Sequence, residues 1–339
     1  MTLDAGKKAD ILERLLPSGF SFKGSGTAYA PSNIALSKYW GKRDAALNLP
    51  CNSSLSISLG AWGSKTTIDQ SSTSQDEIFF NQVKLEDTDP QALKILAHVD
   101  LFRRTQNIPL RIVTSNSIPT AAGLASSASG FAALTLALDR ALGLGLSTNV
   151  LSMMARFGSG SAARSLWHGF VKWERGIAPD GTDSVGHPVD VSWPELRIAI
   201  VPVDTAPKKF SSRDGMTHTL ATSPLFQAWP DQAENDCTEI EAAVRARDLR
   251  KLGALAESNA LAMHATMMAA RPSLNYLTPD SWQVLTRLWA AREEGLAAYA
   301  TMDAGANVKL LFEARDSDSI QTLFPNATVI APFDNPPEL

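Results

Sequence analysis

Small residues fill the stretch from Asn116 to Gly130, Asn-Ser-Ile-Pro-Thr-Ala-Ala-Gly-Leu-Ala-Ser-Ser-Ala-Ser-Gly, which has the composition of a phosphate-binding loop. It follows an apolar, β-branched run (110–114) and precedes an Ala/Leu-rich segment (131–146), so a strand, a loop and a helix are expected. Small side chains let backbone N–H groups approach an anion, and the helix N-terminus favours phosphate there. Neither a Walker A sequence nor a three-glycine dinucleotide fingerprint is present. A tight Ala/Ser helix start packed under another element is the alternative.

Cations and aromatic side chains are concentrated between residues 38 and 43. Lys38 and Lys42 are four residues apart and flank Tyr39, Trp40 and Gly41. Two ammonium groups beside a tyrosine hydroxyl suit a phosphorylated or carboxylated ligand. For each cation taken singly, however, a solvated edge with a snorkelling side chain is the competing interpretation.

A second Gly/Ser turn, residues 158–165, follows an apolar helical segment. It offers hydroxyls and backbone N–H groups, and Arg164 lies about one helical turn beyond Ser161 on the same face. A plain flexible turn with a surface arginine is the alternative. Residues 207–216 again place cations and hydroxyls at the start of an expected helix. The sequence therefore contains three candidate anion sites at helix starts.

One carboxylate, Asp303, stands in a small-residue turn, Met302-Asp-Ala-Gly-Ala-Asn307. We predict a helix over residues 282–300 before it and an apolar strand after it. Such a turn can hold a carboxylate still and partly dehydrated. The alternative is an Asx-turn aspartate, the most common role of Asp beside Gly.

The elements that position these groups form an α+β pattern. Strands are predicted at 52–59, 66–68, 78–83, 110–114, 166–173 and 196–203, and long amphipathic helices at 231–247, 249–269 and 282–300. The 339 residues are enough for two lobes, which we place at 27–200 and 201–339 with the active site in the cleft between them. Residues 1–26 form a leader of unassigned role, with Leu12, Leu15 and Leu16 on a short amphipathic helix.

The net charge of −4 gives no general electrostatic reason to expect nucleic acid or an acidic membrane as partner. The two cysteines and five histidines have no metal-ligand spacing, which predicts no His/Cys metal site. A run of ~18 apolar residues, as a membrane span needs, does not occur. These features predict a reduced, cytoplasmic protein.

Four motifs, in chain order, closely resemble the diphosphomevalonate decarboxylase family. They are Asn33-Ile-Ala-Leu-Ser-Lys-Tyr-Trp-Gly-Lys42, Pro119-Thr-Ala-Ala-Gly-Leu-Ala-Ser-Ser-Ala128, Gly158-Ser-Gly-Ser-Ala-Ala-Arg-Ser165 and Met302-Asp-Ala-Gly-Ala-Asn307. The resemblance implies an N-terminal ATP-binding lobe like a ribosomal-protein domain and a ferredoxin-like α/β C-terminal lobe with long helices. It also implies ATP-dependent, Mg²⁺-dependent conversion of mevalonate 5-diphosphate to isopentenyl diphosphate, by phosphorylation of the C3 hydroxyl and loss of phosphate and CO₂. Relatives are commonly homodimers.

The same resemblance assigns roles to individual residues. Asp303 would orient or deprotonate the C3 hydroxyl, Arg164 would clamp the C1 carboxylate beside it, Asn33 would support that arginine, and Lys208 would contact the transferring phosphoryl group. The substrate would be held mostly through its diphosphate by Tyr39, Lys42, Ser159, Gly160, Ser161, Ser212, Arg213 and Met216. The ATP loop would comprise Pro119, Ala122, Gly123, Leu124, Ala125, Ser126 and Ser127, with Ser127 a candidate Mg²⁺ ligand.

Three departures from the family pattern, Ser37, Ala163 and Ala306, remove no charged group. A monophosphate decarboxylase and a mevalonate 3-kinase that never decarboxylates are the closest alternatives. A nucleic-acid-binding module rests only on fold analogy.

Overall fold

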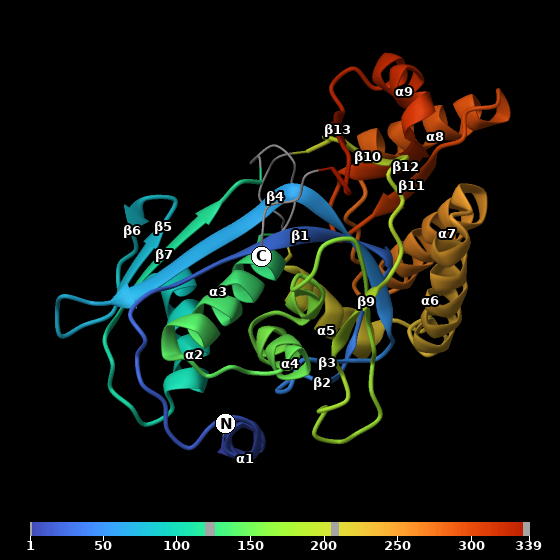
Figure 1. Cartoon of the computed structure of the whole chain (residues 1–339). Coiled ribbons are helices and arrows are strands. Elements are labelled where there is room, and N and C mark those ends of the chain that lie inside the picture. The colour runs from blue at the N-terminus through green and yellow to red at the C-terminus, as the bar shows by residue number, and fades with distance from the viewer. Residues whose placement is uncertain (1, 119–125, 205–209, 335–339) are drawn as a thin grey trace.

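The computed structural model describes residues 2–118, 126–204 and 210–334. Two sheets organise the chain, and Figure 1 shows the long strands β1 and β4 running from the first sheet towards the second. The predicted α+β class is confirmed. Among the described residues, no helix is both long and apolar enough to cross a bilayer.

The first sheet has the order β6-β5-β7-β4-β8-β9, with β1 paired to β4. Its strands are β1 (Gly26–Ser37), β4 (Ser54–Gln70), β5 (Glu77–Phe80), β6 (Val83–Lys84), β7 (Leu110–Asn116), β8 (Phe170–Trp173) and β9 (Gly186–Val189). Three helices, α2 (Pro90–Arg103), α3 (Ser127–Leu142) and α4 (Thr148–Gly158), share an apolar core with this sheet, and α3 packs directly on β1 and β4.

Strand β4 is one continuous strand, whereas separate strands at 52–59 and 66–68 are predicted from the sequence. Gly60 and Gly63 lie in the interval between the two predicted strands. In the structure Gly60 has φ +56°, and a Cβ on Gly63 would lie 2.2 Å from the Ala30 carbonyl. These glycines therefore let β4 shift its register against β1 without ending.

The second sheet has the order β11-β12-β10-β13 and holds β10 (Leu196–Val201), β11 (Tyr299–Met302), β12 (Val308–Glu313) and β13 (Thr328–Ile330). Its helices are α6 (Trp229–Ala246), α7 (Leu249–Met268), α8 (Pro279–Glu293) and α9 (Ser317–Leu323), with α5 (Ser212–Thr222) preceding them. A short ladder of β2 (Lys42–Asp44) with β3 (Leu49–Pro50) and two 3₁₀ segments, η2 (Gly160–Arg164) and η3 (Ala314–Asp316), complete the described elements.

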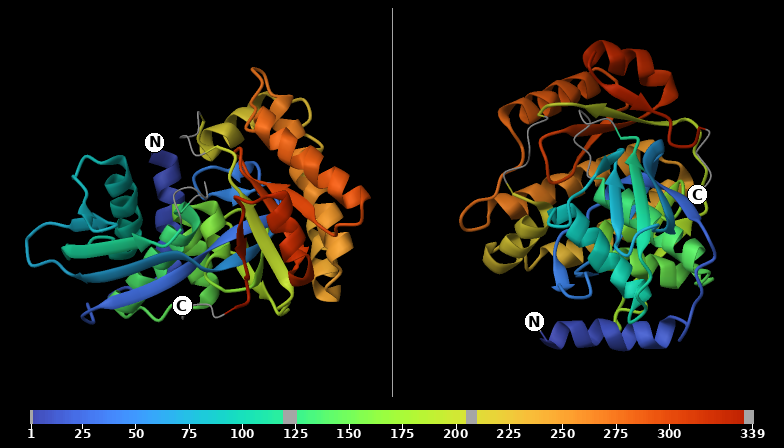
Figure 2. Two further views of the ribbon diagram at one scale, coloured as in Figure 1. Left: turned by 90° about the horizontal axis from the view of Figure 1, so that it is seen from above. Right: turned by 90° about the vertical axis from the view of Figure 1, so that its left-hand side faces the viewer.

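The division of the chain at residue 200 stays a prediction, although β10 crosses that position and pairs wholly within the second sheet. The leader forms helix α1 (Thr2–Leu15), which is longer than the short helix expected. Figure 2 shows α1 at the far side of the molecule from the second sheet and its helices.

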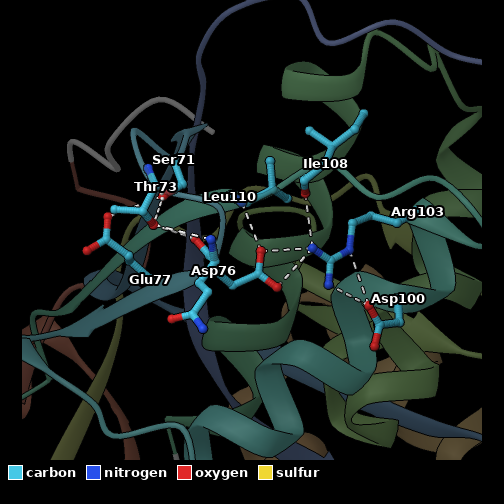
Figure 3. A network of polar contacts seen from close by, with 9 residues as sticks. Ser71, Thr73, Asp76, Glu77, Asp100, Arg103, Ile108 and Leu110 are labelled. Carbon is cyan, nitrogen blue, oxygen red and sulfur yellow. Dashed lines mark hydrogen bonds and ion pairs between the residues drawn. The ribbon is translucent and has the colours of Figure 1, made fainter.

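The rim of the first sheet is held by an ion-pair network around Arg103 at the end of α2 (Figure 3). Its guanidinium bonds Asp76, 2.8 Å away, Asp100, 2.6 Å away, and the Ile108 carbonyl. Asp76 also accepts from the Leu110 backbone N–H at 2.8 Å. Because these bonds join α2 to the segments flanking β5 and β7, we regard Arg103 as a structural residue.

Candidate active site

A cleft of about 1440 Å³ is lined by segments from both the first and the second half of the described chain. The predicted site residues that line it are Asn33, Tyr39, Lys42, Ser127, Ser159, Gly160, Ser161, Arg164, Ser212, Arg213, Met216 and Asp303. Ser126 does not line it, and Pro119, Ala122, Gly123, Leu124, Ala125 and Lys208 lie outside the described residues. The fold therefore brings residues more than 250 positions apart in the chain into one cavity.

Asp303 lies between two buried lysines. Its Oδ1 is 2.9 Å from Lys38 Nζ, and its Oδ2 is 3.2 Å from Lys309 Nζ. The two lysine side chains are 2% and 3% exposed, whereas the aspartate side chain keeps 37% exposure towards the cleft. Burial alone would raise the pKa of Asp303, but the charges of Lys309 and Lys38 outweigh it and hold that pKa well below its usual range. The cleft therefore presents an ionised carboxylate.

The backbone around Asp303 differs from the sequence-based prediction. We predicted a helix directly before it, but α8 ends at Glu293, and β11 intervenes. The β-branched and aromatic residues of Tyr299–Met302 are buried against α7 and pair with β12, so packing overrides their helical neighbours. Asp303 thus occupies the connection between two antiparallel strands, where His264 Nε2 donates to its carbonyl at 3.2 Å.

Arg164 is buried, with 3% exposure, at the end of η2. A 3₁₀ helix has three residues per turn, so Ser161 and Arg164 share one face, and both line the cleft. Its Nη1 donates to the Ser54 hydroxyl. The Nε is fully buried and has no hydrogen-bond partner among the described residues. A buried guanidinium that lines a cleft favours an anionic ligand there, because the ligand neutralises its charge.

Asn33 contacts the residues on both sides of this arginine in sequence. Its side-chain amide donates to the Ser165 hydroxyl at 2.7 Å and to the Ser161 carbonyl at 3.4 Å. Asn33 comes from β1, so the two bonds join η2 to the first sheet. They fix the backbone that carries Arg164.

Tyr39 lies against η2 at a contact that only glycine permits. A Cβ on Gly160 would be 2.9 Å from the Tyr39 hydroxyl oxygen. Burial raises the pKa of the Tyr39 phenol, which stays protonated, and its hydroxyl has no partner in the part of the chain described. Gly41, two residues on, has φ +104°, and a Cβ there would meet the Phe226 ring at 2.4 Å. The glycine of the cation–aromatic cluster therefore aims Tyr39 and Lys42 into the cleft.

Lys42 Nζ donates to Asn48 Oδ1 at 2.6 Å. Burial, with the positive charges of Arg213 and Lys8, lowers the pKa of the Lys42 ammonium to about 8. Arg213 follows Ser211, whose hydroxyl accepts from the Asp214 backbone N–H and caps helix α5. One end of the cleft thus gathers cations from separate segments beside a helix N-terminus, which is an arrangement suited to phosphate.

The N-terminus of α3 forms another wall of the cleft. Ser127 is exposed there, and its hydroxyl is 3.5 Å from that of Ser159, which is 3.4 Å from that of Ser161. Ser126 has no side-chain capping bond. The small-residue stretch 116–130 and the Gly/Ser turn 158–165 therefore contact each other through three serine hydroxyls.

Sequence reasoning missed three residues of the Asp303 environment, Lys38, Lys309 and His264. The sequence leaves a solvated edge as an alternative for Lys38, whereas the structure buries this lysine fully. Lys309 lies among apolar residues in β12. A single charge inside an apolar strand could have indicated a buried ionic partner. His264 lies inside a helical pattern and gave no signal.

The family comparisons agree with this geometry. Residues 30–186 match the diphosphomevalonate decarboxylase-like N-terminal domain, and residues 198–333 match the mevalonate 5-diphosphate decarboxylase C-terminal domain. The diphosphomevalonate decarboxylase of Candida albicans is 36% identical over 322 residues, covering 88% of this chain and 87% of that protein.

Solved structures show the same likeness. The mevalonate diphosphate decarboxylase of Staphylococcus aureus superposes with a TM-score of 0.86 at 37% identity, covering 91% of this chain and 95% of that one. A structure of MDDEF in complex with MVAPP, AMPPCP and magnesium superposes with a TM-score of 0.84 at 38% identity, covering 91% and 98%. The fold is that of these mixed α+β enzymes. The chain belongs to the diphosphomevalonate decarboxylase family, as the four motifs predict.

Proposed function

We propose that this protein catalyses the ATP-dependent decarboxylation of mevalonate 5-diphosphate to isopentenyl diphosphate, with release of ADP, phosphate and CO₂. One observation carries the proposal: an ionised Asp303 between two buried lysines shares a cleft with the buried guanidinium of Arg164. A carboxylate for the C3 hydroxyl and a guanidinium for the C1 carboxylate are what this substrate requires.

We assign Asp303 to orienting the C3 hydroxyl. Its low pKa makes it a weak general base, and phosphoryl transfer depends mainly on positioning and charge neutralisation. The hydroxyl oxygen bonds to the γ-phosphorus of ATP as the bond between that phosphorus and the ADP oxygen breaks, and the hydroxyl proton passes to water. The C3–O bond then breaks with its electrons leaving on phosphate, and the C1–C2 bond electrons form the new double bond as CO₂ departs. Arg164 would hold the carboxylate until that step.

Nucleotide phosphates would lie at the N-terminus of α3, where the dipole and Ser127 face the cleft. The described residues hold no group of three His, Cys, Asp or Glu side chains that could bind a metal. A Mg²⁺ ion held mainly by ATP phosphates, with Ser127 as a protein ligand, fits this donor set. The ion would neutralise phosphate charge.

Ser127→Ala should weaken ATP binding several-fold and leave mevalonate diphosphate binding within about twofold. Ser126→Ala is the matched control and should change neither, because Ser126 does not line the cleft. Titration calorimetry with each ligand separately measures both. Equal losses for the two ligands would contradict separate sites.

The substrate diphosphate would occupy the cationic end of the cleft, contacted by Tyr39, Lys42, Ser159, Gly160, Ser161, Ser212, Arg213 and Met216. Arg213→Ala should cost about 1.5 to 3 kcal/mol of diphosphate binding, roughly tenfold to a hundredfold. The Michaelis constant for the monophosphate should change little, since a monophosphate is too small to reach all these donors at once. Steady-state kinetics with both substrates measure the ratio. An unchanged preference would favour the monophosphate decarboxylase alternative.

ATP-dependent release of labelled CO₂ from the mono- and diphosphate, measured side by side, tests the function itself. Release from the diphosphate supports the proposal. Phosphorylation without CO₂ would identify a 3-kinase instead.

The family resemblance also supports a cytoplasmic location and a homodimer. Each protomer would consist of two lobes, residues 27–200 and 201–339. Light scattering on the purified protein tests the dimer, and a monomer would refute it.

A further inference from the structure

The N-terminal helix α1 precedes the residues matched to the family, which begin at residue 30. It is firmly docked on the first lobe. Ile11, Leu12 and Leu16 are 2–5% exposed and belong to the same apolar core as α2 and α4. Because three apolar side chains of this segment are buried in that core, α1 is held in place against the rest of the protein.

Two ion pairs at the protein surface link the docked helix to the rest of the chain, and such exposed pairs contribute little to stability. Lys7 Nζ is 3.1 Å from Asp44 at the end of β2, and Arg14 is 2.6 Å from Asp180. These contacts join α1 to the end of β2 and to the connection between β8 and β9.

Lys8 is the α1 residue that lines this cleft. Its ammonium lies 5.3 Å from the centroid of the Phe157 ring, immediately before the second Gly/Ser turn. Asn48 links the same place to Lys42: its amide donates to the Phe157 carbonyl at 3.1 Å, and its oxygen accepts from Lys42 Nζ at 2.6 Å. Lys8 thus stands at the end of the cleft that holds Lys42.

The electrostatics agree with this placement. The charge of Lys8 contributes to the lowered pKa of Lys42. It also contributes to the lowered pKa of His98, which is about 3 mainly because the imidazole is buried. Lys8, Lys42 and Arg213 come from α1, β2 and α5, and all line the cleft. Like charges brought together at one end of a cavity repel unless an anion lies between them.

We propose that Lys8 of helix α1 binds the terminal phosphate of the substrate diphosphate together with Lys42 and Arg213, so that α1 completes the diphosphate subsite and contributes to the preference for two phosphates over one. This inference rests on the proposed function for the identity of the substrate. The three cations in one cleft identify only an anion as the ligand.

Lys8→Met keeps the apolar stem and removes the charge. The Michaelis constant for mevalonate diphosphate should rise about tenfold, and the dissociation constant of inorganic pyrophosphate should rise by a similar factor. The turnover number, the Michaelis constant for ATP and that for the monophosphate should stay within about twofold. Lys8→Arg should restore most of the diphosphate affinity.

Lys7→Met is the matched control, because it removes the neighbouring charge of the same helix at a position outside the cleft. It should leave all these constants within about twofold. Unchanged diphosphate and pyrophosphate affinity in Lys8→Met, or an equal loss in Lys7→Met, would overturn the proposal. Wild-type CO₂ release tests the proposed function separately, since pyrophosphate titration does not depend on turnover.

Discussion

Asp303→Asn should lower the turnover number by about three to four orders of magnitude, the range expected for loss of a group that aligns and polarises a reacting hydroxyl. The amide carries no charge and presents one oxygen in place of two. ATP and mevalonate diphosphate should still bind, because the residues proposed to hold their phosphates lie elsewhere in the cleft. Single-turnover phosphorylation and CO₂ release, measured together, locate the lost step.

The variant should remain folded. Burial already lowers the pKa of Lys38 to about 8, against the opposing effect of Asp303, so this lysine can lose its proton when its partner becomes neutral. Circular dichroism and ligand titration check the fold and the binding. Turnover close to that of the wild type would refute the assignment of Asp303.

Arg164→Met should lower kcat/KM by about three orders of magnitude while leaving the free energy of unfolding unchanged or slightly raised. Two charge-assisted bonds to the substrate carboxylate, each about 1.5–3 kcal/mol, would be lost. The free protein, in contrast, no longer buries a guanidinium whose Nε is unsatisfied, and replacing such a charge by an apolar side chain is often neutral or stabilising.

Arg156→Met is an informative comparison. Arg156 is also fully buried, and its Nη2 also has no partner among the described residues, but its other donors bond the backbone carbonyls of Leu47, Gly181 and Ser184. Its replacement should destabilise the fold by about 2–4 kcal/mol, since buried carbonyls lose their donors. Urea unfolding and steady-state kinetics on both variants separate the two roles. If Arg164→Met lost stability and kept activity, the carboxylate clamp would be wrong.

The sequence by itself determined the parts of the site that depend on local backbone chemistry. Gly41 and Gly160 stand where close approach requires glycine, and the 3₁₀ turn brings Ser161 and Arg164 to one face. These motifs also predict the family, and the pattern of strands and amphipathic helices predicts the α+β class.

Only the tertiary structure decided which charges meet. The ion pair of Lys38 with Asp303 spans 265 positions, so no spacing rule could predict it. No spacing rule could predict the burial of Arg164 either, or the position of Lys8, in the N-terminal leader, at the cleft. Sheet pairing decided the strand before Asp303 and the continuity of β4, because long-range packing outweighs local propensity. Local chemistry thus specifies each side chain and its turn, and the pairing of distant strands decides its neighbours and its charge.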